Sequence, residues 1–182
     1  LGMCIYAISS FLLLSSYRDI ENEAMVQNLR RATDAITEFT GQQRIKLADW
    51  AAWDEAYEYA RDRDPEWAAA TIYATGLANL DINAMMFTDT QGNIIRLMAV
   101  DIYKRAEAEH QSLEAYFEAH PDLVMFDSLE DETAGVVMAP NGPLIVVSLP
   151  LRTSEGEGPS TGSLTFARYL DAVKVSDFSD VT

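Results

Sequence analysis

The sequence has little cysteine and little basic charge, and each shortage limits what the protein can be. Cys4 is the only cysteine among 182 residues, so no disulfide can form within the chain and the redox compartment cannot be inferred. Lysine and arginine together number 13 against 29 aspartates and glutamates, a formal net charge of −16. Because such a surface repels phosphate backbones, we expect no nucleic-acid partner.

Patterns for catalysis and for metal binding are also missing. His110 and His120 lie ten residues apart, with no further ligands at metal-site spacing. The acidic run 62–66 resembles the start of a calcium loop, but Trp67 stands where that loop needs glycine. The sequence contains no phosphate-binding glycine loop, nucleophile elbow or Cys–His pair. We therefore expect a non-enzymatic fragment with no catalytic residue, metal or cofactor.

The first seventeen residues contain no charge at all. As a helix, 1–17 would span roughly 25 Å, slightly less than a bilayer core of about 30 Å. Tyr17 and Arg18 suit a membrane interface. The pattern favours a transmembrane helix trimmed at its start. A signal peptide and a buried core helix are the alternatives.

Proline is absent from residues 18–60, and Gly41 is the only glycine there, which predicts one long helix. Apolar residues recur along it at spacings of three and four: Met25, Leu29, Ala32, Ile36 and Phe39. This seam predicts either a parallel homodimer through the helix or packing of the helix on its own domain.

The hydrophobic period changes after residue 80. Asp62–Pro65 breaks the helical pattern, and a shorter helix is expected over 66–80. Strands are expected at 84–88, 94–100, 135–139, 144–151 and 163–170, with a helix over 108–120. Residues 89–93 predict the turn of a hairpin. The sequence thus predicts an α+β fold, a long N-terminal helix packed on a five-stranded antiparallel sheet.

Aromatic and charged side chains at helical spacing mark one candidate site. Trp50, Trp53, Asp54 and Tyr57 would share a face of the long helix, where they could form the wall of a ligand pocket against the sheet. In the alternative interpretation the indoles pack in the core, and Asp54 caps a loop or binds backbone amides. Arg168 could bind a ligand carboxylate or pair with a structural acid. Asp54 or Arg168 would be the polar anchor of the pocket.

Several short motifs occur in the order typical of one family. They are Trp53-Asp54 with Tyr57, Asn79-Leu80, Asp89 with Gly92, Gly142-Pro143, Pro150-Leu151, Gly158-Pro159, Gly162-Ser163-Leu164 and Arg168. Together, over residues 20 to 182, they resemble the CHASE4 family of extracytoplasmic sensory domains. Ala167 departs from the pattern, since the family often has glycine there.

The resemblance implies a PAS-like sensor domain over 18–182, outside the cell membrane in a bacterial or archaeal receptor anchored by 1–17. It also implies a small-molecule ligand and a cyclic-di-GMP enzyme or histidine kinase as output elsewhere in the receptor, while the homodimer is expected from the apolar seam of the long helix. The alternative is a ligand-free dimerisation and signal-relay module. A periplasmic enzyme would need convergent titratable groups that the sequence does not suggest.

Overall fold

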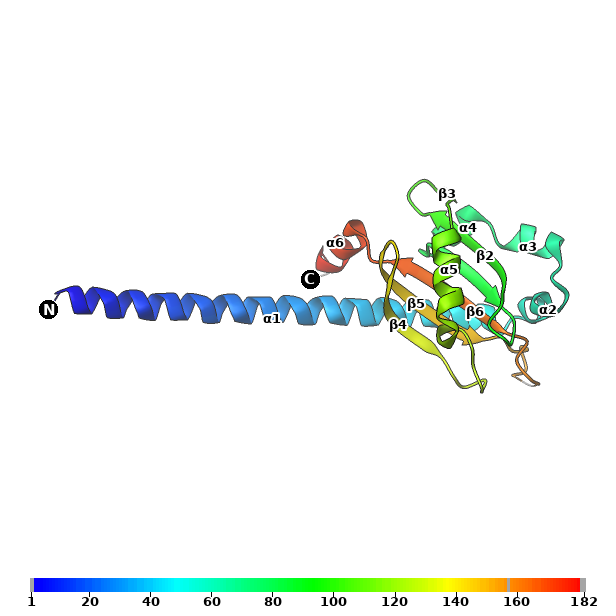
Figure 1. Cartoon of the computed structure of the whole chain (residues 1–182), viewed down its shortest axis with the longest axis horizontal. Helices are drawn as coiled ribbons and strands as arrows, with labels where there is room; N and C mark the ends of the chain where they lie inside the picture. The colour runs from blue at the N-terminus through cyan, green and yellow to red at the C-terminus, as the bar shows by residue number, and fades with distance from the viewer. Residues whose placement is uncertain (1, 157, 181–182) are drawn as a thin grey trace.

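The N-terminal half of the protein is dominated by one helix. The computed structural model describes the backbone of residues 2–156 and 158–180 and the side chains of 25–156 and 158–178. Helix α1 (Gly2–Ala51) projects from the rest of the molecule, and its last turns lie along the sheet (Figure 1). The expected continuity between 1–17 and the following helix is confirmed from residue 2 onward.

The membrane prediction rests on residues 1–17, whose side chains lie outside the described residues. In the described part of the chain, no helix has both the length and the apolar composition needed to cross a membrane.

The long helix ends earlier than predicted. Trp53 is extended, with φ −88° and ψ 126°, and a separate helix α2 (Asp54–Asp62) follows it. The missed signal is the acidic pair that opens α2, Asp54 and Glu55, because negative charge in the first turn favours a helix start.

The helix predicted over 66–80 is also two helices. The predicted break before Pro65 is confirmed: Asp64 caps α3 (Pro65–Thr71) by accepting a hydrogen bond from the Glu66 amide at 2.8 Å. Ile72 and Tyr73 are extended, and α4 (Ala74–Asn79) follows.

The sheet is antiparallel with the strand order β3-β2-β1-β6-β5-β4. The five predicted strands are present, and the short edge strand β3 makes a sixth that the sequence did not predict. The strands are β1 (Ala84–Thr88), β2 (Ile94–Asp101), β3 (Ala106–Glu107), β4 (Thr133–Ala139), β5 (Gly142–Pro150) and β6 (Ser163–Tyr169).

The predicted hairpin between β1 and β2 is confirmed. Asp89 accepts hydrogen bonds from the amides of Gln91 and Asn93, both at 2.9 Å, and Gly92 adopts φ 80°. Glycine takes this conformation without the steric penalty of a side chain.

Side chains alternate between two cores, one on each face of the sheet. Met85, Phe87 and Phe166 face a core that includes Leu47 of α1. Met86 and Ala167 face a second core under α5 (Gln111–Ala119), whose Leu113 and Phe117 are buried as predicted. Figure 1 shows α1 and α5 on opposite faces.

Two further segments complete the chain. A short 3-10 helix, η1 (Pro121–Leu123), follows α5. Helix α6 (Ala172–Asp180), which the sequence analysis missed, comes after β6 and lies beside α1 (Figure 1).

Candidate functional site

The predicted aromatic cluster surrounds the break between α1 and α2. The Trp50 ring lies edge-on to Trp53, at 5.7 Å between ring centroids, and edge-on to Phe166 of β6 at 6.4 Å. Trp53 also meets Trp67 of α3 at 6.0 Å, and 41% of its surface is exposed. Trp50 and Trp67 therefore pack against the core, whereas the Trp53 ring meets these two indoles and remains partly exposed.

The four predicted site residues do not share a face of one helix. That geometry was wrong because α1 ends at Ala51, so Trp50 belongs to α1 and Tyr57 to α2, with Trp53 in the break between them. Their role in binding a ligand stays a prediction.

Asp54 anchors a loop to the start of α2. Its carboxylate accepts hydrogen bonds from the backbone amide and the hydroxyl of Ser154, both at 2.8 Å. The hydrogen bond from the Ser154 backbone amide has the larger effect on the pKa of Asp54, followed by that from the Ser154 hydroxyl, and together they hold this pKa below its usual value. The Tyr57 hydroxyl donates to the Pro159 carbonyl at 3.0 Å, and Thr161 donates to the Tyr57 carbonyl at 3.1 Å. Both predicted polar residues of this segment thus hold the loop that precedes β6.

Arg168 is the centre of a buried polar network at one end of the sheet. Its side chain is 2% exposed and pairs with Asp81 at 3.0 Å and Asp171 at 2.9 Å. It also donates to the Asn83 amide oxygen at 3.1 Å and to the Tyr103 hydroxyl at 3.5 Å. Burial alone lowers the pKa of Arg168, but the two carboxylates more than offset that effect and the pKa is raised. Arg168 has structural acids as partners, one of the two roles expected for it.

The same network also contacts helices α6 and α1. Lys174 of α6 pairs with Asp81 at 2.6 Å, and its ammonium lies 3.9 Å from the centroid of the Phe39 ring in α1. Phe39 in turn packs on Phe178 of α6, with ring centroids 5.8 Å apart. The end of β6, helix α6 and helix α1 therefore meet at one junction.

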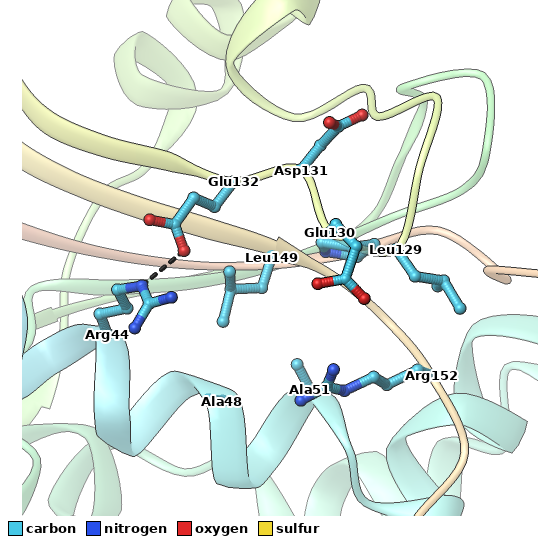
Figure 2. Close-up of a pocket in the computed structure, with 10 residues that line it drawn as sticks. Arg44, Ala48, Ala51, Leu129, Glu130, Asp131, Glu132, Leu149 and Arg152 are labelled. Carbon is cyan, nitrogen blue, oxygen red and sulfur yellow. Dashed lines mark hydrogen bonds and ion pairs between the residues drawn. The ribbon is translucent and has the colours of Figure 1, made fainter. Parts of the chain in front are cut away.

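A small charged hollow lies where α1 passes the loop before β4 (Figure 2). Its volume is about 90 Å³. Arg44 of α1 forms an ion pair with Glu132, and the Arg152 amide donates to the Ala51 carbonyl at 2.9 Å. Because a water molecule occupies about 30 Å³ in the liquid, this hollow suits a few waters better than an organic ligand.

Two larger hollows lie on the opposite face of the sheet, beside α5. One, with a volume of about 300 Å³, lies along most of strand β2. The other, of about 370 Å³, is at the Arg168 end of the sheet and is lined by Asn83, Tyr103 and Asp171, all bonded to Arg168. Sequence reasoning missed these three residues because they come from separate turns and only the folded sheet brings them together.

The two histidines have local partners. The His120 ring stacks on Tyr116 with centroids 4.3 Å apart, and its Nδ1 lies 2.7 Å from the Tyr116 carbonyl oxygen. His110 lies 3.9 Å from the Glu114 carboxylate. Within the described residues, no group of three or more His, Cys, Asp or Glu side chains is arranged to hold a metal ion.

The fold resembles that of solved sensor domains. One is the extracellular domain of a protein assigned as the histidine kinase vpHK1S-Z8, with a TM-score of 0.51 and 15% sequence identity. The match covers 78% of this chain and 56% of that domain's chain. The Escherichia coli DcuS sensor domain has a TM-score of 0.50 and 10% identity, with 80% of this chain and 98% of that one covered. At these identities the likeness concerns the fold alone.

A curated relative and a family model give the sequence-level comparison. The methanogenesis regulatory histidine kinase FilI of Methanothrix harundinacea (strain 6Ac) is 21% identical over 163 residues, which are 90% of this chain. The chain spans only 18% of the length of that kinase. The CHASE4 domain model matches residues 35–182, which is most of the chain. The resemblance carried by the ordered motifs is thereby confirmed, and the chain belongs to the CHASE4 domain family.

Proposed function

We propose that this domain is the extracytoplasmic ligand sensor of a transmembrane signalling receptor. Membership of the CHASE4 family and the PAS-like fold support sensing. The uncharged segment 1–17, at the far end of α1 from the sheet, supports membrane anchoring (Figure 1). The receptor's output would be a histidine kinase, as in the relative FilI, or a cyclic-di-GMP enzyme.

The observation that carries the proposal is the junction of α1, α6 and the end of β6. Asp81 accepts from both Arg168 of β6 and Lys174 of α6, and Lys174 lies over the Phe39 ring of α1. A change at the end of the sheet therefore acts on the two helices directly. A ligand shifts them only if it binds one arrangement better than the other.

Homodimerisation through α1 is part of the proposal. Met25 and Leu29 are 60% and 61% exposed, whereas Ile36 and Phe39 pack on their own domain. This difference in exposure supports a division of the seam between the two uses predicted for it. The first part of the described seam is free to pair with a second copy, and the second part belongs to the core.

A ligand-free relay module is the second candidate, and the aromatic cluster favours it. Trp50 packs on Phe166, Trp67 packs on Phe87, and Tyr57 is buried, so protein fills much of the predicted wall, while Trp53 remains 41% exposed. In this function the domain would transmit dimer geometry without binding a small molecule.

A distance measurement separates the two candidates. Full-length chains reconstituted in lipid nanodiscs, with a spin label at position 29 of each protomer, report the separation of the two α1 helices. A metabolite library is first screened for compounds that raise the melting temperature. The sensor function requires that a stabilising compound change the label distance. Binding with an unchanged distance distribution would leave the relay function as the better account.

A further inference from the structure

The contacts that hold helix α6 against the rest of the molecule are unusual for a helix. Among its described side chains, those of residues 172–178, only Lys174 is buried, at 8% exposed, and Phe178 is half-buried. The apolar Val173 and Val175 are 51% and 52% exposed. Helices normally bury an apolar stripe and leave lysine in water. The attachment of α6 therefore depends on a charged side chain.

The buried ammonium of Lys174 is paired with Asp81. Its Nζ atom donates to Asp81 Oδ2 at 2.6 Å, while Arg168 Nε donates to the other oxygen, Oδ1, at 3.0 Å. The same ammonium lies 3.9 Å from the centroid of the Phe39 ring of α1 and 5.3 Å from that of Phe178. Aromatic rings attract a cation through their faces. The Asp81 carboxylate and these two rings thus compensate for the removal of Lys174 from water.

Such a pair responds differently to the loss of one partner and to the loss of both. Burying a lysine costs free energy that the carboxylate and the rings return, so a buried pair adds little net stability. Loss of the carboxylate alone leaves an unpaired charge in a dry site, which is strongly unfavourable. Lys174 lies on the face of α6 that meets Phe39 and Asp81. Its ammonium therefore regains water when the helix lifts away from α1.

We propose that Lys174 and Asp81 form an ionic latch, which holds α6 on α1 and opens when the Asp81 carboxylate is withdrawn or loses its charge. Arg168 is placed to control the latch, because it binds the same carboxylate from the end of β6. A rotation of the guanidinium that took both oxygens of Asp81 would leave Lys174 unpaired. The latch rests on the proposed sensor function for its biological meaning, but its opening can be measured without a ligand.

A second pair of spin labels measures the position of α6. Full-length chains in nanodiscs carry labels at the exposed positions 42 of α1 and 177 of α6, with the native Cys4 replaced by serine. Dilution with unlabelled chains removes distances between protomers. We expect a narrow distance distribution in the parent protein. A helix of nine residues is about 14 Å long, so the released α6 of Asp81→Asn should broaden the distribution to roughly 10 Å or more.

A double variant separates the charge of Lys174 from its packing. Methionine is unbranched and packs well on aromatic rings, and it carries no charge that needs a partner. Lys174→Met should therefore keep α6 docked, and Asp81→Asn combined with Lys174→Met should restore the narrow distribution. A narrow distribution in Asp81→Asn alone overturns the latch. A broad distribution in the double variant also overturns it, because the loss of Asp81 would then act through Arg168 or the fold.

Charge reversal covers the case in which Asp81→Asn does not fold. Lys174→Glu places a carboxylate opposite Asp81 and leaves the pair between Asp81 and Arg168 intact, so it should release α6 while circular dichroism shows a folded domain. Lys104→Glu is the matched control, since it reverses an exposed lysine that pairs with Asp101, and it should leave the α6 distance unchanged. Equal broadening by the two reversals, or none by Lys174→Glu, refutes the latch.

The latch and the sensor function fail in different ways. If the variants release and restore α6 as expected, but no stabilising compound changes the label distance at position 29, the latch stands and the sensor function fails. If a compound changes that distance while α6 keeps its position in Asp81→Asn and in Lys174→Glu, the sensor function stands and the latch is refuted.

Discussion

At the scale of single residues, Gly162 shows where the fold tolerates no side chain. Its φ is 146°, and an added Cβ would lie 1.8 Å from the Thr88 carbonyl oxygen, at the start of the β1–β6 pairing. Both the backbone conformation and the close approach of β1 require glycine here. Gly135, on the edge strand β4, has no neighbouring atom within 4 Å of the same hypothetical Cβ.

These two glycines give a matched pair of substitutions. Gly162→Ala should lower the free energy of unfolding by about 3 kcal/mol or more, since strain and a backbone clash add together. Gly135→Ala should change it by no more than about 1 kcal/mol. Urea denaturation followed by circular dichroism measures both. Similar effects of the two substitutions would show that β1 and β6 do not approach as closely as described.

Substitution of Arg168 measures how much the buried network contributes to stability. Arg168→Met should destabilise the domain by about 1–3 kcal/mol, because Asp171 loses its cation and Asp81 keeps only Lys174, although both carboxylates remain partly hydrated. Arg61→Met removes an exposed pair with Glu58 and should cost less than about 1 kcal/mol. Both values come from urea denaturation at neutral pH. A small effect at Arg168 would mean that water or the other residues satisfy the two carboxylates.

Asp171 should make the stability of the domain depend on pH. Burial raises the pKa of Asp171, but hydrogen bonds from the Lys174 amide and from Arg168 outweigh it, so the folded pKa lies below the usual value. Stability from this group is therefore complete above about pH 4 and is lost as pH falls through the folded pKa. In urea denaturation between pH 5 and 2, Asp171→Asn should lose stability less steeply than the parent protein. Glu118→Gln serves as the control, and an unchanged slope for Asp171→Asn would contradict the assignment.

At the scale of elements, the sequence predicted the parts with the strongest periodicity. The β1–β2 hairpin, β5 and β6 were predicted from apolar runs bounded by turn residues. Helix α5 was predicted from the helical spacing of apolar residues such as Leu113 and Phe117, which are buried in the structure. The break after Ala51 was missed because no proline or glycine marks it. Instead the acidic pair at the start of α2 and the tie from Asp54 to Ser154, a hundred residues away in the sequence, define it. Such a contact exists only once the sheet has formed.

The tie between Asp54 and Ser154 makes a prediction about the loop before β6. Asp54→Ala should increase amide hydrogen exchange in residues 152–156 and 158–162, because two of the bonds that hold this loop are lost. Glu55→Ala changes an exposed neighbour on α2 and is the control. Unchanged exchange in both variants would show that Tyr57 and Thr161 hold the loop without Asp54.

At the scale of the whole molecule, the exposed part of the α1 seam predicts a parallel dimer. With the native Cys4 replaced by serine, Leu29→Cys in membranes should form disulfide-linked dimers on mild oxidation, since Leu29 lies in the exposed stripe. Arg31→Cys, about 200° further around the helix, should crosslink much less. Comparable crosslinking at both positions would indicate random collision and not a helix pair. Gel electrophoresis without reducing agent measures the result.

The unbroken length of α1 has a mechanical consequence. A helix of 50 residues is about 75 Å long, and its last turns are fixed to the sheet while the rest projects freely. A tilt of about 5° at the junction with Phe39 would move a point about 50 Å away along α1 by roughly 4 Å. If the proposed signalling occurs, helix α1 would convert a small rearrangement around Arg168 and Lys174 into a displacement as large as those of known switching elements.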